Sequence, residues 1–383
     1  MKRKILSLVI GIAMAASVFT GCTNSGSSGT GSSGDIKIGV IMPLTGSVAQ
    51  FGQSGKKGLD LLQEETNKSG GILGKKVKFI YEDDEGKAAS SVNVAQKLIN
   101  DEKVVAIEGP LTSTCAISVA AIAQQNKIPM VSGTATNIKV TQAGDYVFRT
   151  CFIDPFQGTA VAKFASTKLN AKTATILYNN SDDYSKGLTD AFKAAFEKSG
   201  GKVLETETYA TNDQDFNAQL TKLKSKNSDV MFLPDYYSTV GVIAKQARNL
   251  GIKSTFLGGD GWDSSKLFDI GGTAVDGAYF SDHYSADDTA PAVVEFVKNY
   301  KTKYNEVPDA MAALNYDAAK ILLQAIKDGG KTDADSIKNA LAKMDTNVVS
   351  GNVKIDKDRN AVKAAVMIQA KDGKNVFSEK INP

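Results

Sequence analysis

The sequence predicts an α/β protein with two doubly wound parallel sheets. Short runs of β-branched and apolar residues alternate along the chain with stretches of helical apolar spacing. This alternation is typical of parallel strands covered by helices on both faces. It runs to about residue 132 and starts again near residue 174. About 350 residues follow the N-terminal leader, a length that accommodates two domains.

The first unit opens with a strand and continues in the order strand, helix, strand. The run Ile36–Met42 is rich in β-branched residues and is ended by Pro43 and Gly46, so it is predicted to be the opening strand. Three leucines at helical spacing predict a helix over residues 58–65. The further elements are strands at 77–81, 104–107 and 129–132, and helices at 88–100 and 113–125.

The second unit repeats this order and is followed by a helical region. The predicted strands are 174–178, 203–209, 230–234 and 255–258, and the helices between them are 184–198, 216–226 and 240–250. Three helices are predicted after them, at 291–304, 311–327 and 333–344. Two short apolar runs, 351–355 and 362–370, are predicted to form an antiparallel pair.

The N-terminal leader has the pattern of an export signal. Three basic residues at positions 2–4 precede an apolar run over 5–19, which is too short for a comfortable membrane span. Gly21 and Cys22 end the leader and resemble a bacterial lipobox, in which the cysteine is acylated, and a Ser/Gly-rich segment follows to residue 34. Phe19 stands where such boxes usually have leucine. The alternative is ordinary cleavage after residues 13–15, and in either case the mature chain is expected to work outside the cytoplasm.

Composition excludes several classes of function. Removal of the leader leaves 42 basic residues against 42 acidic ones, without the basic surplus that a nucleic-acid binder needs. Cys115 and Cys151 form no Cys-x-x-Cys motif, and either a single bridge or two buried thiols are compatible with their positions. The only histidine, His283, is expected to be structural. No metal, no cofactor and no catalytic nucleophile–base pair is therefore predicted.

Three loops at the ends of predicted strands carry candidate ligand-binding groups. The loop 109–114 opens a helix at Ser113, where free N–H groups, the helix dipole and hydroxyl groups suit a carboxylate. A simple helix cap is the alternative. The loop 133–137 is also small and hydroxylated, although a plain turn is compatible with it. Asp260 lies between two glycines beside Trp262, where it either faces a ligand ammonium or forms a turn.

Aromatic residues near the same strand ends could form the walls of a pocket. Tyr184, Tyr236 and Tyr237 follow predicted strands of the second unit. A carboxylate-binding loop, an acid and aromatic walls together describe a receptor for a free amino acid.

At these residues the chain resembles the extracellular solute-binding proteins of branched-chain amino acid ABC transporters, over residues 36 to about 374. The resemblance rests on the order and spacing of short segments. These are 38–46 (IGVIMPLTG), 48–52 (VAQFG), 111–113 (LTS), 134–137 (TATN), 148–150 (FRT), 184–188 (YSKGL), 246–248 (QAR) and 259–261 (GDG).

The resemblance implies a role for ten side chains. Ser113, helped by Thr136, would bind the ligand carboxylate, and the Thr134 carbonyl and Asp260 would take the ammonium. The remaining six would surround the ligand side chain: Phe51, Leu111, Thr112, Tyr184, Tyr236 and Met311. The chain departs from the family pattern at two positions. Leucine-type proteins often have glutamate where Asp260 stands and an aromatic residue where Met311 stands, so family membership does not fix the ligand.

The resemblance also implies a periplasmic-binding-protein type I fold, with two lobes joined by three crossings and closing about a hinge. The expected division is a signal peptide over 1–21, a lipid-anchored linker over 22–34, one lobe over 35–154 and 285–350, and a second lobe over 155–284 and 351–383. A monomer that delivers leucine, isoleucine or valine to a membrane permease is expected. The alternatives are a sensor module for another small amino acid or amide, although the chain stops at Pro383 without a membrane span or signalling domain, and a secreted enzyme.

Overall fold

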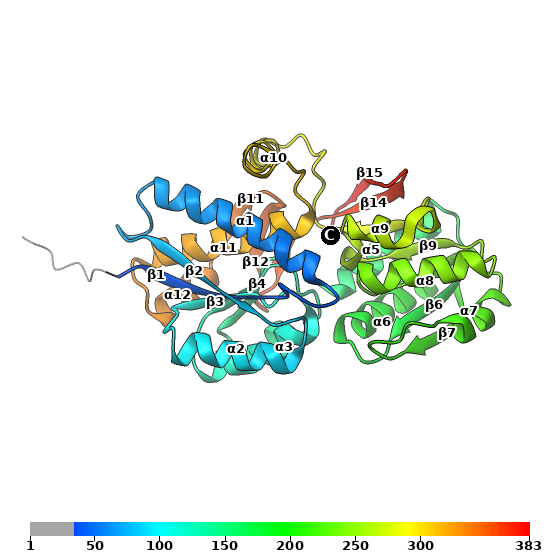
Figure 1. Ribbon diagram of the computed structural model, residues 1–383, viewed down its shortest axis with the longest axis horizontal. Coiled ribbons are helices and arrows are strands. Elements are labelled where there is room, and N and C mark those ends of the chain that lie inside the picture. Colours follow the sequence, from blue (N-terminus) through cyan, green and yellow to red (C-terminus); the bar gives the residue numbers. More distant parts are fainter. Residues whose placement is uncertain (1–33) are drawn as a thin grey trace, which may run out of the picture. The chain divides into compact units, whose positions relative to one another are not determined.

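Two separate β-sheets organise the chain, and each is the centre of one lobe (Figure 1). The computed structural model describes residues 34–383. The predicted signal peptide, Cys22 and all but the last residue of the predicted linker lie outside the described residues. We call the lobe with the five-stranded sheet the first lobe and the lobe with the seven-stranded sheet the second lobe.

The sheet of the first lobe is entirely parallel. Its strand order is β2-β1-β3-β4-β5, so the chain runs outward from β1 in both directions. The strands are β1 (Ile36–Met42), β2 (Val77–Asp83), β3 (Ala106–Glu108), β4 (Met130–Ser132) and β5 (Val147–Arg149). Nearly every residue of β1, β3, β4 and β5 is buried, as expected for parallel strands with helices on both faces.

Helices cover both faces of this sheet (Figure 1). One layer consists of α1 (Ala49–Lys68) and α11 (Ala310–Gly329), with α10 (Pro291–Tyr304) against α1 and α12 (Ala334–Leu341) against α11. The other layer holds α2 (Ala88–Asn100) and α3 (Ser113–Gln125), and the short α4 (Lys139–Gln142) packs on α3. The helices α2 and α3 have the predicted bounds.

The helix α1 begins nine residues before the predicted start, and the part that the prediction missed is rich in glycine. A side chain at Gly58 would place its Cβ 2.2 Å from the Ala312 carbonyl oxygen, and one at Gly52 would lie 2.1 Å from the Pro43 carbonyl oxygen. Glycine therefore allows α1 to approach α11 and the loop after β1 closely. The same glycines make the first half of α1 difficult to predict from the sequence, since glycine lowers helix propensity.

The sheet of the second lobe has the order β15-β14-β10-β9-β8-β6-β7. Strands β6 (Thr173–Asn179), β7 (Lys202–Tyr209), β8 (Val230–Phe232), β9 (Thr255–Gly258) and β10 (Tyr279–Asp282) are parallel. Strands β14 (Ala365–Lys371) and β15 (Lys374–Ile381) are antiparallel additions at one edge. The helices are α5 (Asp154–Thr167), α6 (Asp183–Lys198), α7 (Asn217–Lys224), α8 (Tyr237–Asn249) and α9 (Lys266–Gly271), with 3₁₀ turns η1 (Asp260–Trp262) and η2 (Gly272–Val275).

The predicted pairing of the last strands is wrong for most of its length. Strand β12 (Gly351–Ile355) pairs with β11 (Asp345–Val348) and with β13 (Ala361–Val362) in a separate three-stranded sheet. The rest of the predicted run belongs to β14, which pairs with β10 and β15. The apolar run is divided at Lys363, where the chain passes from one sheet to the other. Only the pairing of β14 with β10 joins segments that lie far apart in the chain, and such a pairing cannot be read from a local pattern.

Three segments connect the lobes: 150–153 between β5 and α5, 283–290 between β10 and α10, and 363–364 between β13 and β14. The three-stranded sheet is held to the first lobe, since Thr141 Oγ1 donates to Asn360 Oδ1 at 3.0 Å and the Arg149 backbone N–H donates to the Arg359 carbonyl. The predicted two-lobe α/β fold with three crossings is confirmed.

The structure of residues 34–383 also shows the state of two cysteines and the character of the helices. Cys115 and Cys151 are both buried free thiols, so no bridge joins them. Among residues 34–383 no helix has both the length and the apolar character required to cross a membrane.

Candidate functional site

A small cavity lies between the two lobes, where strands of both sheets end. With the lobes closed, its volume is only about 20 Å³. The first lobe contributes residues of α1 and α11 and of the loops after β3 and β4, and the second contributes residues that follow β6, β8 and β9. Ligands of open α/β sheets bind in this position. The lining residues are Phe51, Leu111, Ser113, Thr134, Tyr184, Tyr236, Asp260, Gly261 and Met311.

Eight of the ten side chains singled out in the sequence line this cavity, and two do not. Thr112 lines a neighbouring, larger cavity that also has residues of both lobes in its wall. Thr136 is a buried residue of the loop after β4, and its hydroxyl has no hydrogen-bond partner within residues 34–383. Gly261 is the one lining residue that sequence reasoning did not select.

The first lobe presents hydrogen-bond donors to the cavity. Helix α3 begins at Ser113 and follows Thr112, whose extended backbone is that of a cap residue. Ser113 Oγ accepts the backbone N–H of Asn137 at 3.2 Å, which leaves the hydroxyl proton free to donate. The Thr134 hydroxyl donates to the Leu111 carbonyl at 2.6 Å and ties the two loops together. Because a helix N-terminus has unpaired N–H groups and a positive dipole end, this wall suits an anionic group.

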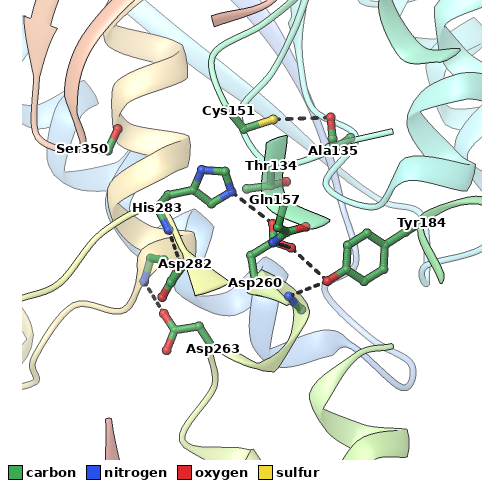
Figure 2. Close-up of polar contacts among 12 residues, drawn as sticks. Thr134, Ala135, Cys151, Gln157, Tyr184, Asp260, Asp263, Asp282, His283 and Ser350 are labelled. Atoms are coloured by element: carbon green, nitrogen blue, oxygen red, sulfur yellow. Dashed lines mark hydrogen bonds and ion pairs between the residues drawn. The ribbon is translucent and has the colours of Figure 1, made fainter. Parts of the chain in front are cut away.

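The second lobe presents the carboxylate of Asp260, which is 3% exposed (Figure 2). Its Oδ1 accepts hydrogen bonds from Gln157 Nε2 at 2.7 Å and from the Tyr184 hydroxyl at 2.9 Å. Its Oδ2 lies 3.1 Å from His283 Nε2. The Tyr184 hydroxyl in turn accepts the Gly261 N–H at 3.1 Å. These contacts fix the orientation of the Asp260 carboxylate.

The glycine ahead of Asp260 is required by packing. A Cβ at Gly259 would lie 2.6 Å from the Tyr184 hydroxyl and 2.6 Å from Leu188 Cδ2. Any side chain there would push Tyr184 away from Asp260. Asp260 opens the 3₁₀ turn η1 and also lines the cavity. Both interpretations of this acid, as a turn residue and as a residue that faces a ligand, are therefore compatible with the structure.

Two residues that contact Asp260, His283 and Gln157, were difficult to identify from the sequence. His283 is fully buried and its ring stacks on Phe152 with the ring centroids 3.5 Å apart. Burial lowers the pKa of His283 to about 4, so the imidazole is neutral at neutral pH. Gln157 lies inside α5, in a segment where no element was predicted. The only signal for His283 is that it is the sole histidine and follows an acid at a strand end.

Aromatic and aliphatic side chains form the rest of the wall. The rings of Tyr184 and Tyr236 are stacked with centroids 5.1 Å apart, and Phe51 of the first lobe meets Tyr236 edge-on at 5.9 Å. Leu111 and Met311, which are 4% and 3% exposed, complete the apolar surface. Apolar walls with a few fixed polar groups are typical of small-molecule sites.

Hydrogen bonds across the cleft hold the two lobes closed on the cavity. Thr114 Oγ1 donates to Asp182 Oδ2 at 2.8 Å and accepts the Asp183 N–H at 2.9 Å. Asn137 Nδ2 donates to the Asp183 carbonyl at 2.7 Å, and Lys139 pairs with the Asp183 carboxylate at 2.9 Å. All these contacts join the first lobe to the start of α6. The closed arrangement explains the small volume of the cavity.

Metal ligands are not grouped in this region. No set of three or more His, Cys, Asp or Glu side chains within residues 34–383 is arranged to hold a metal ion.

Comparison with known proteins identifies relatives over nearly the whole described chain. Residues 35–375 match the family model described as "Periplasmic binding protein". The chain is 34% identical over 300 residues to a Leu/Ile/Val-binding protein homolog of Brucella melitensis biotype 1, covering 78% of this chain and 80% of that protein.

Two solved structures have the same fold. A leucine binding protein of Thermotoga maritima superposes with a TM-score of 0.88 at 38% identity, covering 91% of this chain and 99% of that one. A branched-chain amino acid transporter substrate binding protein of Streptococcus pneumoniae, solved with isoleucine, has a TM-score of 0.86 at 33% identity, covering 91% of this chain and all of that one.

Proposed function

The chain belongs to the periplasmic binding protein family, among the branched-chain amino acid binding proteins of ABC transporters, and from this premise we propose that it captures free leucine, isoleucine or valine between its two lobes. The family is one of binding proteins and not of enzymes. The observation that supports the proposal best is the cavity itself, with donors for a carboxylate on one lobe and a fixed acid on the other.

The two charged ends of an amino acid fit the two walls of the cavity. We place the ligand carboxylate at Ser113 and the start of α3, where the free hydroxyl proton and the helix N-terminus favour negative charge. We place the ammonium between Asp260 and the Thr134 carbonyl, as a charge-assisted hydrogen bond. Since the two groups belong to different lobes, a ligand that bridges them stabilises the closed form.

The apolar wall is suited to an aliphatic side chain. Phe51, Leu111, Tyr236 and Met311 provide it, and none of them brings a charge into the cavity. A buried ionised side chain would have no partner on this wall, which disfavours acidic and basic amino acids. Met311 is unbranched and adaptable, so it accommodates side chains of slightly different shape.

A thermal-shift screen of the mature protein against the twenty amino acids tests this function. Leucine, isoleucine or valine at 100 times its dissociation constant is expected to stabilise the folded protein by about 2.7 kcal/mol, which raises the melting temperature by a few degrees. Lysine, glutamate and the decarboxylated amine of leucine serve as controls and are expected to have no effect. A larger shift with another small amino acid or an amide would replace the proposed ligand, and no shift with any of them would contradict the function.

We further propose that the protein acts as an extracytoplasmic lipoprotein monomer that delivers its ligand to a membrane permease. Cys22 would carry the lipid and residues 23–34 would form a tether. Ser/Gly-rich segments behave as flexible coils, which would leave the lobes free to open and close near the membrane. We assign residues 35–149 and 291–362 to the first lobe and 154–282 and 365–383 to the second, with the three connecting segments between them. The expected boundary at residue 350 moves to follow the pairing of β12 with β11.

Mass spectrometry of the mature N-terminus tests the anchor. The N-terminal peptide is expected to begin at Cys22 and to carry a diacylglyceryl mass, and the protein is expected to partition with membranes. Cys22→Ser should release it into the soluble fraction, whereas Cys115→Ser should leave it in the membrane because Cys115 is a buried core thiol. An unmodified N-terminus at residue 16 would instead indicate ordinary cleavage after residues 13–15.

A further inference from the structure

The single histidine of the chain contacts the acid that faces the cavity (Figure 2). His283 follows β10 at the start of a segment that connects the lobes, and Asp260 opens η1 after β9. The imidazole has no exposed surface, and it stacks on Phe152 of another connecting segment. We infer that His283 is a positioning residue, which orients Asp260 toward the ligand ammonium without sharing its charge. This inference rests on the function proposed above.

The distribution of hydrogen bonds on the carboxylate supports this role. Oδ1 already accepts two donors, from Gln157 and Tyr184, at 2.7 and 2.9 Å. Oδ2 accepts only one, from His283 at 3.1 Å. Each carboxylate oxygen has two lone-pair positions. The remaining position on Asp260 is therefore on Oδ2, and an incoming ammonium shares this oxygen with His283.

The protonation state of the imidazole then decides how much of the negative charge of Asp260 is available to the ligand ammonium. Because Asp260 is an acceptor, a neutral His283 that donates to it must carry its proton on Nε2, and Nδ1 has no partner among the described residues. A neutral donor fixes the carboxylate and leaves its negative charge to the ammonium. An imidazolium would place a second cation on the same oxygen and would compete with the ligand.

The surroundings of His283 keep it in the neutral state. Burial is the largest effect and lowers its pKa to about 4, while the hydrogen bond to Asp260 acts in the opposite direction. The positive charge of Lys363, on the segment between β13 and β14, lowers the pKa of His283 further. Asp282 of β10 is a further titratable neighbour, and its carboxylate accepts the His283 backbone N–H at 2.7 Å. Cys151 precedes Phe152 in the connecting segment, and burial raises the pKa of its thiol.

The sign of the pH dependence follows from these contacts. The pKa of His283 lies below its ordinary value of about 6.5, so the neutral form that favours binding is present throughout the range above about pH 5. The titration of His283 is therefore expected to change ligand affinity by less than about twofold from pH 5.5 to 7.5. If His283 had an ordinary pKa, it would become protonated as the pH fell through this range, and the affinity of the protein for its ligand would fall with it.

Nuclear magnetic resonance of the imidazole tests the contact without any ligand. Because the untagged chain has one histidine, its ring nitrogens give a single assignable set of signals. We expect the neutral Nε2–H tautomer from pH 5.5 to 7.5, a shift of Nε2 on addition of leucine, and a shift of the same nitrogen in Asp260→Asn. An Nδ1–H tautomer, or titration near pH 6.5, would overturn the inference even if leucine binds.

Calorimetry with leucine tests the positioning role. His283→Phe keeps a ring that can stack on Phe152 but removes the donor, and it is expected to weaken binding on the order of tenfold. His283→Gln restores an N–H donor and is expected to bind within about threefold of the wild type. Wild-type affinity in His283→Phe would overturn the inference. If the wild type binds no amino acid, the proposed function fails, while the resonance measurement still decides whether His283 contacts Asp260 as a neutral donor.

Discussion

Asp260→Asn is expected to weaken leucine binding by roughly 2–5 kcal/mol, which is a factor of about 30 to several thousand in the dissociation constant. The substitution keeps the shape of the side chain and removes its charge. The ligand ammonium would then be buried in a closed cavity without its anionic partner. The cost of an uncompensated buried charge exceeds that of a lost neutral hydrogen bond. Isothermal titration calorimetry of the mature protein measures the change.

The asparagine also conflicts with the donors around it. Gln157 and Tyr184 both donate to Oδ1 and His283 donates to Oδ2, so an amide nitrogen faces at least one donor in either orientation. A second, smaller loss of stability is therefore expected, which circular dichroism would detect. Asp269→Asn is the matched control, because Asp269 lies in the same lobe and is largely exposed beside Lys266. Unchanged affinity in Asp260→Asn would remove Asp260 from the site.

Trp262→Ala is expected to lower the free energy of unfolding by roughly 3–5 kcal/mol, the usual cost of removing a large buried aromatic side chain. Trp262 has no exposed surface, and its ring packs so closely on Gly258 that a Cβ there would lie 2.1 Å from the indole. The indole N–H donates to the Leu233 carbonyl at 3.0 Å, which joins η1 to the segment after β8. Urea denaturation followed by far-ultraviolet circular dichroism measures the loss.

Two variants separate the contributions of the ring and of its hydrogen bond. Trp262→Phe keeps most of the ring and loses the N–H, so a smaller loss of about 1–2 kcal/mol is expected. Val294→Ala removes a side chain that is 54% exposed on α10 and should change stability little. Trp262→Ala should also weaken ligand binding, because the same turn carries Asp260. A loss below 1 kcal/mol would show that Trp262 does not anchor η1.

Local patterns in the sequence were sufficient for most of the first lobe. Four of its five strands are buried on both faces and therefore appear as short apolar runs. The helices α2 and α3 have clear ends, and their bounds were predicted correctly. The prediction was incomplete where local signal is weak. The segment 133–173, which contains α4, β5 and α5, has no strong periodicity, and the largely exposed β15 was missed.

The sequence likewise indicated some residues of the candidate site and could not place others. Small and hydroxylated loops at strand ends indicated Ser113 and Thr134, and an acid between glycines indicated Asp260, because parallel strands bring such loops to one edge. Thr112 was placed in the cavity by resemblance, but it lines the neighbouring one. Successive side chains of an α-helix point in directions that differ by about 100°. The sequence therefore does not specify which of the two adjacent residues, Thr112 or Ser113, faces the cavity.

The sequence by itself determined the class of fold, the division into two lobes, the loops that could bind a ligand and the even balance of basic and acidic residues. Each of these depends on composition or on short-range periodicity. Only the tertiary structure decided which side chains surround Asp260. Gln157, Tyr184 and His283 are 103, 76 and 23 residues away from it in the chain and lie on three different segments. Hydrogen bonds between such distant residues form only when the sheet of the second lobe and the helices around it are assembled, and no local pattern encodes them.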